Sequence, residues 1–259
     1  MSIDGDGLAP DWRHRGVGAL MTTRHGGASR GRYATMNVGS AVGDDDGDVA
    51  ANRAILAAAM NAQPVFLRQV HGARAIRVGA ADVGPGAPVH DADAAVTSEP
   101  GIACVVQAAD CLPILLAAPG GRAVGAAHAG WRGLAAGVVA AAVDAVCAAG
   151  SCAPAEIVAW LGPCIGPAAF EVGADVLLAC GVSPGDRVAS AHARFRPGAK
   201  ADKWLADLPG LARDRLAAAG VTQVSGGAWC TVADPSRFFS FRRDGVTGRM
   251  AAAVWIDRR

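Results

Sequence analysis

Three short segments of this chain carry side chains that could bind a metal ion or do nucleophilic chemistry. They are Gln-Val-His-Gly ending at Gly72, Ala-Asp-Cys-Leu-Pro around Cys111, and Ala-His-Ala-Gly-Trp-Arg-Gly around His128. Each segment places an imidazole or a thiol beside glycine or proline, near what we predict to be the end of a strand. Two imidazoles and one thiolate suit Zn²⁺, and three protein ligands leave its fourth position open. The segments therefore predict a catalytic metal site at His71, Cys111 and His128.

The same side chains could instead form a nucleophile pair. A thiol beside an imidazole base is the arrangement of Cys–His hydrolases, and here Cys111 would be the nucleophile with His128 or His71 as its base. A metal site loses activity when the ion is stripped, whereas a nucleophilic cysteine works without metal and is trapped by alkylation. Each residue alone could be an ordinary core residue, but three of them beside Gly- or Pro-marked turns favour a site.

The composition excludes several classes of protein. Hydrophobic residues make up 52% of the 259 residues and charged residues 18%, which argues against disorder. The 24 basic and 23 acidic side chains leave a net charge of +1, so no overall field attracts nucleic acid or an anionic membrane. The acidic start of the chain has no apolar core, and no apolar run reaches the length of a membrane span, so we expect neither a signal peptide nor a transmembrane helix.

The cysteines indicate a reducing compartment. There are seven of them, an odd number, with no Cys-x-x-Cys pair and no dense framework. We therefore expect a cytoplasmic protein with free thiols. Most of these thiols lie among Ala, Val and Leu and are expected in the core. Cys111 differs because it follows Asp110 and precedes Pro113 in a turn-like stretch.

The order of predicted elements favours a layered α+β or α/β sandwich, without repeats or a long linker. Apolar runs predict strands at 17–23, 65–70, 73–78, 92–97, 102–107, 114–117, 123–127, 157–161, 221–224 and 248–256. Helical spacing and capping residues predict helices at 48–61, 133–149, 174–180 and 207–220, the first capped by Asp48 and the last by Asp207. The strands at 65–70 and 73–78 are expected to be neighbours. The middle strands are apolar on both faces, which predicts layers on both sides.

Seven segments stand out when they are taken in order: Thr-Thr-Arg-His-Gly-Gly (22–27), Gln-Val-His-Gly (69–72), Asp-Ala-Asp-Ala-Ala-Val-Thr (91–97), Ala-Asp-Cys-Leu-Pro-Ile (109–114), His-Ala-Gly-Trp-Arg-Gly (128–133), Gly-Pro-Cys-Ile-Gly (162–166) and Phe-Phe-Ser-Phe-Arg-Arg-Asp-Gly (238–245). Together they resemble the bacterial YfiH family, which has been labelled "multicopper polyphenol oxidase" or "laccase domain" and is now regarded as purine nucleoside phosphorylases with adenosine deaminase activity. They extend from Thr22 nearly to the C-terminus. Each motif alone is modest, but the ordered series is specific.

The resemblance implies a fold, a metal and a reaction. The fold is a single-domain αββα-type sandwich related to Cys–His deamidases, over residues 1–259 with a loosely ordered segment at 1–16. The metal is zinc, held by two histidines and one cysteine that fall on His71, His128 and Cys111. The reaction is the phosphate-dependent cleavage of adenosine and inosine, with methylthioadenosine as a further substrate and adenosine deamination as a side activity. The partners are then purine nucleosides and phosphate, and the oligomeric state is unreadable.

The older laccase label can be examined from the histidines. A multicopper site needs many histidines, usually in His-x-His pairs. This chain has six histidines and no such pair: His14, His25, His71, His90, His128 and His192. A full multicopper set cannot be assembled, although a single Cu²⁺ could replace zinc and give a one-copper polyphenol oxidase.

Phosphorolysis requires residues for the phosphate, the ribose and the leaving base. Arg24, Arg132 and Arg242 are candidates for the anion, because a guanidinium matches phosphate oxygens in pairs. Asn37 matches a motif position of the family and could hold a sugar hydroxyl or a base edge. Asp93 could orient a metal-bound histidine.

Several alternatives stay open from the residues alone. Asp110 and Glu171 are further candidates for a carboxylate in the site. Arg243 could equally be an ordinary arginine on the solvated surface. Phe241 stands where the family usually has a tyrosine, so one hydroxyl is missing near the arginines. A Cys–His hydrolase and a non-enzymatic role in cell-envelope editing are the competing classes of function.

Overall fold

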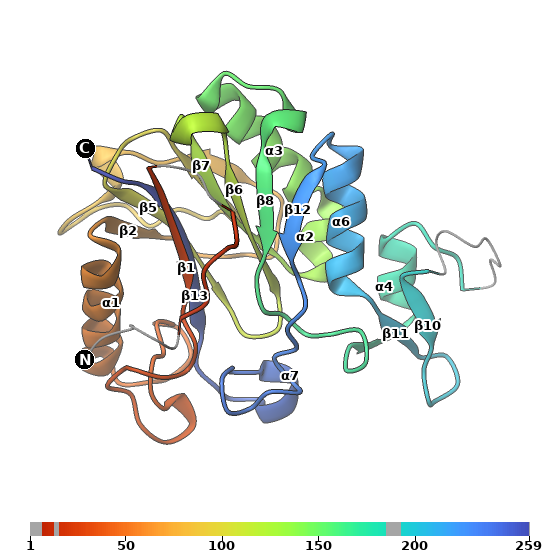
Figure 1. Cartoon of the computed structure of the whole chain (residues 1–259). Helices are drawn as coiled ribbons and strands as arrows, with labels where there is room; N and C mark the ends of the chain where they lie inside the picture. Colours follow the sequence, from red (N-terminus) through yellow and green to blue (C-terminus); the bar gives the residue numbers. More distant parts are fainter. Residues whose placement is uncertain (1–6, 13–15, 185–192, 259) are drawn as a thin grey trace.

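Two β-sheets form the centre of the computed structural model, which describes residues 7–12, 16–184 and 193–258 (Figure 1). The four-stranded sheet has the order β1 (Val17–Met21), β13 (Met250–Ile256), β5 (Ile102–Ala108), β2 (Gln63–Phe66). The six-stranded sheet has the order β12 (Gln223–Gly226), β8 (Val158–Leu161), β6 (Leu112–Ala117), β7 (Val124–Ala129), β4 (Ala94–Thr97), β3 (Ala75–Arg77). A small third sheet has the order β10 (Phe195–Pro197), β11 (Trp204–Ala206), β9 (Glu171–Val172).

The alternation of side chains along the strands creates the layers. Along β5 and β13, Cys104, Val106 and Ala252 face the six-stranded sheet and pack in one core with Leu115 of β6. The intervening residues, such as Ala253, face outwards and form a second core with α1 (Asp46–Met60). Both faces of this sheet are therefore covered, as the doubly apolar strands predicted.

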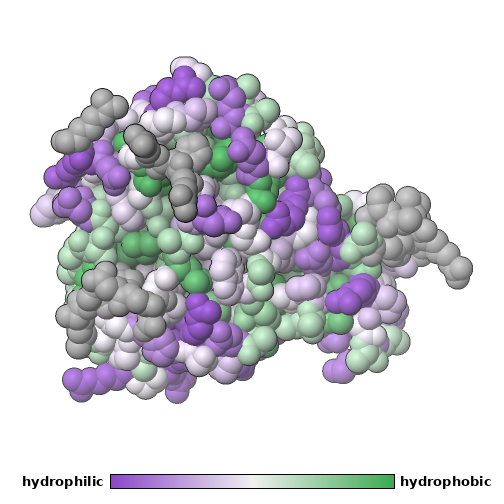
Figure 2. All heavy atoms as spheres, in the orientation of Figure 1, coloured by the Kyte–Doolittle hydropathy of each residue, from purple (hydrophilic) through white to green (hydrophobic). Residues whose placement is uncertain are grey.

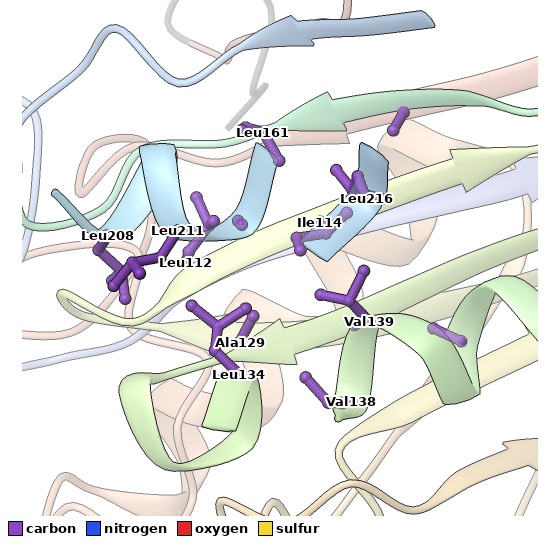
Figure 3. Packing of buried hydrophobic residues seen from close by; sticks show 14 of the residues in the cluster. Leu112, Ile114, Ala129, Leu134, Val138, Val139, Leu161, Leu208, Leu211 and Leu216 are labelled. Carbon is purple, nitrogen blue, oxygen red and sulfur yellow. The ribbon is translucent and has the colours of Figure 1, made fainter. Parts of the chain in front are cut away.

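The six-stranded sheet is covered on its outer face by helices. Figure 3 shows Ile114 of β6 between Val139 of α3 (Val138–Gly150) and Leu216 of α6 (Leu208–Ala218). In Figure 1, α1 lies on one side of the two sheets, and α3 and α6 lie on the other. The order helix, sheet, sheet, helix confirms the αββα sandwich. Short helices complete the structure: α2 (Trp131–Ala136), α4 (Ala174–Ala179) and α7 (Phe241–Asp244).

Two predicted helices differ in detail from those observed. Asp45, not Asp48, caps α1, because its side chain accepts the backbone N–H of Asp48. The helix expected over 133–149 is divided into α2 and α3 at Gly137, whose φ of 96° lies in the left-handed region. The cap of α6 is confirmed, since Asp207 accepts the N–H of Gly210.

The strand predicted over 65–70 is shorter, and its neighbour was predicted wrongly. β2 ends at Phe66 and pairs with β5, whereas β3 pairs with β4 in the other sheet. Residues 67–74 therefore cross from one sheet to the other, and His71 lies on this crossing instead of at a strand end. This crossing positions one of the proposed ligands.

The N-terminal segment pairs with the end of β1. The expected loose segment at 1–16 falls partly outside the described residues, but within it Leu8 forms a backbone bridge with Met21. Among the described helices, none has the length and apolar character needed to cross a bilayer. Figure 2 shows hydrophilic and hydrophobic residues interspersed over one face. One domain over 1–259 stays a prediction.

Candidate functional site

His71, Cys111 and His128 come together at one end of the two sheets. His71 lies on the crossing from β2 to β3, and Cys111 lies on the crossing from β5 to β6. His128 is on β7, where the strand period places its side chain on the same face as Ala126, towards the four-stranded sheet. The ligating atoms of the three residues all lie within 4.8 Å of one another, and the two imidazole rings meet edge to face. The sandwich thus gathers residues from three segments into one cluster.

Asp93, immediately before β4, connects two of these candidate ligands. Its buried carboxylate accepts the Nδ1 proton of His128 at 2.9 Å and the backbone N–H of His71 at 2.9 Å. It also accepts the N–H groups of Gly72 and Val70, at 2.7 and 3.2 Å. The bond to Nδ1 leaves Nε2 of His128 directed at the cluster. Asp93 therefore orients one imidazole and fixes the loop that carries the other.

Two residues of the cluster loops adopt unusual backbone angles. His71 has a φ of 60° and Asp110 a φ of 93°, both in the region that non-glycine residues rarely occupy. The Asp110 carboxylate is held by the Thr231 hydroxyl at 2.5 Å and by the backbone N–H of Arg242 at 2.6 Å. Such strain persists only where surrounding bonds hold it, and it is commonest at functional sites.

Cys111 and His128 form a charged pair in the protein without metal. Burial opposes ionisation of the Cys111 thiol, but charge and hydrogen bonding from His128 and His71 lower its pKa to about 6. Burial also opposes charge on His128, but the Cys111 thiolate and the Asp93 carboxylate raise the pKa of this histidine to about 9. Near neutral pH the pair is therefore thiolate and imidazolium.

The donor set fits a single borderline-soft metal ion. Zn²⁺ takes thiolate sulfur at about 2.3 Å and imidazole nitrogen at about 2.0–2.1 Å, and the three donor atoms here can be drawn to those distances around one ion. Among the described residues, His71, Cys111 and His128 form the one cluster of three or more such donors. The group can hold a metal ion and leaves a fourth position open.

The cluster opens into a cavity of about 760 Å³ whose charged lining is mainly cationic. Its side chains come from both sheets and from loops that extend beyond them. Five arginines line it: Arg53, Arg68, Arg132, Arg242 and Arg249. Asp110 is the one carboxylate residue in the described lining, and its two oxygens already accept hydrogen bonds. The cavity therefore suits an anionic ligand beside an apolar one.

Two of the arginines proposed from the sequence lie in this lining. The guanidinium of Arg132 lies over the ring of Trp131, 4.3 Å from its centroid, and no described residue accepts a hydrogen bond from it. Arg242 donates from Nη1 to the Glu171 carbonyl at 2.9 Å and lies over the Phe170 ring. Arg132 is exposed and available to a ligand, whereas Arg242 is already oriented by the protein.

The structure places Arg24 and Asn37 outside the cavity lining. Arg24 donates to the carbonyls of Ala34 and Pro235, at 3.0 and 2.9 Å, and thereby joins two loops. Asn37 is fully buried, and its side-chain oxygen accepts the N–H groups of Gly39 and Arg249. These contacts hold both side chains in the protein framework, and direct substrate contacts of Arg24 and Asn37 stay predictions.

Three further residues singled out in the sequence have different surroundings. Arg243 is bound to the Thr231 and Phe238 carbonyls and to Asp244, so its role is structural. Glu171 contributes its backbone carbonyl to Arg242. Phe241 lines the cavity with 58% of its surface exposed, so the position where the family resemblance leads us to expect a tyrosine faces the cavity.

Sequence reasoning missed Arg53, Arg68 and Arg249 as cavity residues. Arg53 lies within α1, Arg68 follows β2, and Arg249 precedes β13. No motif or spacing marks these positions. Arg249 carried one weak signal, a charged residue directly before a buried apolar strand.

A two-sheet sandwich with a His–Cys–His cluster at one end of its sheets defines a class of α+β protein. Comparison with similar proteins identifies the family. Residues 18–257 match the family described as "multi-copper polyphenol oxidoreductase laccase". The protein is 45% identical over 252 residues to purine nucleoside phosphorylase YfiH of Escherichia coli, covering 96% of this chain and 98% of that one. It is 43% identical over 255 residues to a purine nucleoside phosphorylase of Pseudomonas aeruginosa, covering 96% and 98%. The chain belongs to the YfiH family.

Solved structures show the same fold. A Neisseria meningitidis protein is 43% identical with a TM-score of 0.86, covering 98% of this chain and 100% of that one. YlmD from Geobacillus stearothermophilus is 34% identical with a TM-score of 0.88, covering 100% and 98%. The multicopper description of the family contrasts with the six histidines and the single described donor cluster, which fit one metal ion.

Proposed function

We propose that this protein is a zinc-dependent purine nucleoside phosphorylase that cleaves adenosine and inosine, and methylthioadenosine as a further substrate. In this reaction the bond between C1′ of the ribose and N9 of the purine breaks, and its electron pair leaves with the base. A phosphate oxygen forms the new bond to C1′, which gives ribose 1-phosphate, or 5-methylthioribose 1-phosphate from methylthioadenosine, and the base takes up a proton. The names of the similar proteins support this reaction.

One observation carries the proposal: a single cavity of about 760 Å³ is lined by both the His–Cys–His cluster and five arginines. A volume of this order is typical of sites for small molecules. The arginines would hold the phosphate, since guanidinium groups bind its oxygens in pairs. Apolar residues beside the cluster, such as Trp131 and Ile165, would contact the uncharged nucleoside.

Zinc held by His71, Cys111 and His128 would supply Lewis acidity at its open position. The protein's own side chains would orient the ligands and bind the anion. Asp93 keeps the proton on Nδ1 of His128, so that Nε2 stays free as a donor atom. Arg132, which is exposed in the cavity, would bind the anionic co-substrate.

The proposal is tested by product analysis with inosine. Wild-type protein should release hypoxanthine when phosphate is present and almost none when it is absent. His71→Ala should lose most of this activity and its zinc, because removal of a ligand commonly costs at least about 10–100-fold in affinity or activity. His90→Ala is the matched control, since that imidazole is bound to Asp82 and lies outside the cluster. Equal hypoxanthine release without phosphate would contradict phosphorolysis.

A Cys–His hydrolase is the second candidate, favoured by the thiolate–imidazolium pair of Cys111 and His128. It requires activity without metal. Alkylation by iodoacetamide distinguishes the hydrolase from the zinc enzyme. In a zinc enzyme the bound ion protects Cys111 from alkylation, and stripping the ion makes Cys111 reactive. If the stripped protein stays fully active and alkylation of Cys111 abolishes that activity, the hydrolase takes first place.

The proposal includes a deaminase side activity and a cytoplasmic location. The deaminase follows from the family resemblance alone, and conversion of adenosine to inosine without phosphate would test it. The location is supported by the cysteines, all seven of which are free thiols. Copper in place of zinc would test the oxidase alternative: protein reloaded with Cu²⁺ should oxidise phenols only if that alternative is correct.

A further inference from the structure

Two of the cavity arginines contact the loop that follows Asn37. Both Arg53 and Arg249 touch residues 38–40. Arg53 donates from Nε to the Val38 carbonyl at 2.9 Å and from Nη2 to the Ser40 hydroxyl at 3.3 Å. Gly39 lies so close to Arg249 that a Cβ added to it would be 2.8 Å from the Arg249 side chain. The Arg53 guanidinium and the aliphatic part of the Arg249 side chain therefore both contact one short loop, and all four of Gly39, Ser40, Arg53 and Arg249 line the cavity.

Hydrogen bonds from a buried side chain fix the loop at residues 38–40 relative to Arg249. The buried Asn37 side chain accepts the N–H groups of Gly39 and Arg249 at 2.9 and 2.8 Å and donates to Asp44 at 2.8 Å. The N–H of Val38 is bonded to the Arg249 carbonyl. The loop and the start of β13 are thus fixed relative to each other. A site that is already formed loses little entropy when a ligand binds.

Neither arginine has a carboxylate partner among the described residues. Arg249 donates from Nη1 to the Thr247 and Gly248 carbonyls, and Arg53 lies over the Phe66 ring, 4.0 Å from its centroid. Both are partly buried, and burial lowers the pKa of each. Because a guanidinium keeps its charge in proteins, two such charges without a carboxylate partner in the lining of one cavity favour binding of an anion.

We infer that Arg53 and Arg249, with the loop from Gly39 to Ser40, form a site for a phosphate group. Two guanidinium forks and a hydroxyl donor match the oxygens of a tetrahedral dianion. Arg249 also lies near enough to Cys111 and Asp110 to feel their charges, so the site belongs to the same cavity as the metal cluster. The inference builds on the proposed function, because it assigns the phosphate a place within that active site.

Two sources could supply this phosphate group. One is inorganic phosphate, the co-substrate of phosphorolysis. The other is the 5′-phosphate of a nucleoside 5′-monophosphate, whose base and sugar would occupy the rest of the cavity. Both use the same oxygens and the same arginines. Binding measurements with inorganic phosphate, inosine and inosine 5′-monophosphate distinguish them.

The experiment is calorimetric titration of the zinc-loaded protein without turnover. Arg53→Gln and Arg249→Gln should each weaken binding of inorganic phosphate by about 10–100-fold, because each removes charge-assisted hydrogen bonds. Arg77→Gln is the control, since Arg77 is exposed on β3 and is bound to Ser98. Zinc content should stay at one ion per chain in all variants, which shows that the cluster is intact.

The outcomes decide both the site and the source. If inosine 5′-monophosphate binds more tightly than inosine and loses this advantage in both variants, the 5′-phosphate also uses the site; if it binds no better, inorganic phosphate is the ligand. Unchanged affinity for both phosphates in both variants, or no phosphate binding to the wild type, would overturn the inference. If Arg249→Gln does not fold, Arg249→Lys replaces it in the test. Lysine keeps the charge but lacks the paired N–H donors of a guanidinium, so phosphate affinity should still fall. Phosphate binding through these arginines without release of hypoxanthine would contradict the phosphorylase and leave this site standing.

Discussion

At the scale of single residues, Asp93 shows how one buried carboxylate can order ligands that come from different segments. It bonds to the ring of His128 and to the backbone of His71, and burial makes each bond costly to lose. The sequence could suggest Asp93 as a partner of a metal-bound histidine, because it precedes a strand in a family motif. The second half of its role, holding a loop by its N–H groups, was not predictable, since backbone contacts leave no trace in residue types.

Replacing Asp93 should therefore weaken metal binding without changing a ligand. Asp93→Asn keeps the size of the side chain but removes its charge, and we expect zinc affinity to fall by about 10–100-fold. Competition with a chromophoric chelator measures this affinity. Asp91→Asn is the matched control, because Asp91 is exposed and pairs with Arg68. Wild-type zinc affinity in Asp93→Asn would contradict the role given to this carboxylate.

The pair of Cys111 and His128 predicts how zinc binding depends on pH. Above about pH 6 the Cys111 thiol is already ionised, whereas His128 keeps its proton up to about pH 9. Zinc must displace that proton, so between these values its affinity should rise about tenfold per pH unit with release of one proton. Above pH 9 this dependence should vanish, and below pH 6 it should steepen, because the thiol must also lose a proton. Titration in buffers of different ionisation enthalpy counts the protons, and no release at pH 7.5 would contradict the charged pair.

At the scale of elements, the short helix α2 connects the cluster to the core. It begins after Gly130, where an added Cβ would lie 2.8 Å from the Cys111 sulfur and 3.4 Å from the His71 ring. It ends at Gly137, where φ is 96° and an added Cβ meets nothing within 4 Å. The two glycines of one helix therefore serve different purposes, close approach at one end and a left-handed turn at the other.

This difference predicts opposite phenotypes for two alanine substitutions. Gly130→Ala should lower zinc affinity and activity with little loss of stability, because its new methyl group presses on the cluster. Gly137→Ala should cost about 1–2 kcal/mol in the free energy of unfolding, because an L-residue is strained at this φ, and it should leave zinc binding intact. Urea unfolding and chelator competition on both variants measure the two quantities. The account is contradicted at this helix if both variants lose the same property.

The same helix shows where prediction from sequence stopped. Apolar residues at i+4 spacing run from Leu134 through Val138 to Val146, and this unbroken pattern concealed the turn at Gly137. Likewise the apolar run at 73–78 indicated a strand but not its partner, since periodicity does not specify which strands pair. The layers were predictable, because a sheet whose strands are apolar on both faces must have another layer packed on each face.

At the scale of the whole molecule, the sandwich creates its site where the chain passes between sheets. His71 and Cys111 lie on two such crossings, and His128 faces the other sheet from β7. The grouping of these three side chains was predictable because soft donors beside Gly and Pro stand out in the sequence, and their role as metal ligands stays a prediction. The cavity arginines were not predictable, because Arg53 and Arg249 are separated by 196 positions and only the fold brings both into the lining of one cavity. The metal cluster and these arginines share one cavity, and this arrangement leads us to propose phosphorolysis.

The most direct test of that proposal follows the phosphorus atom itself. Zinc-loaded wild-type protein is incubated with inosine and inorganic phosphate, and the reaction is followed by ³¹P NMR while hypoxanthine is measured in the same sample. We predict that the inorganic phosphate signal is replaced by that of ribose 1-phosphate, in equal amount to the hypoxanthine released. Release of hypoxanthine with an unchanged phosphate signal, and free ribose as the other product, would contradict the central claim and make the protein a hydrolase.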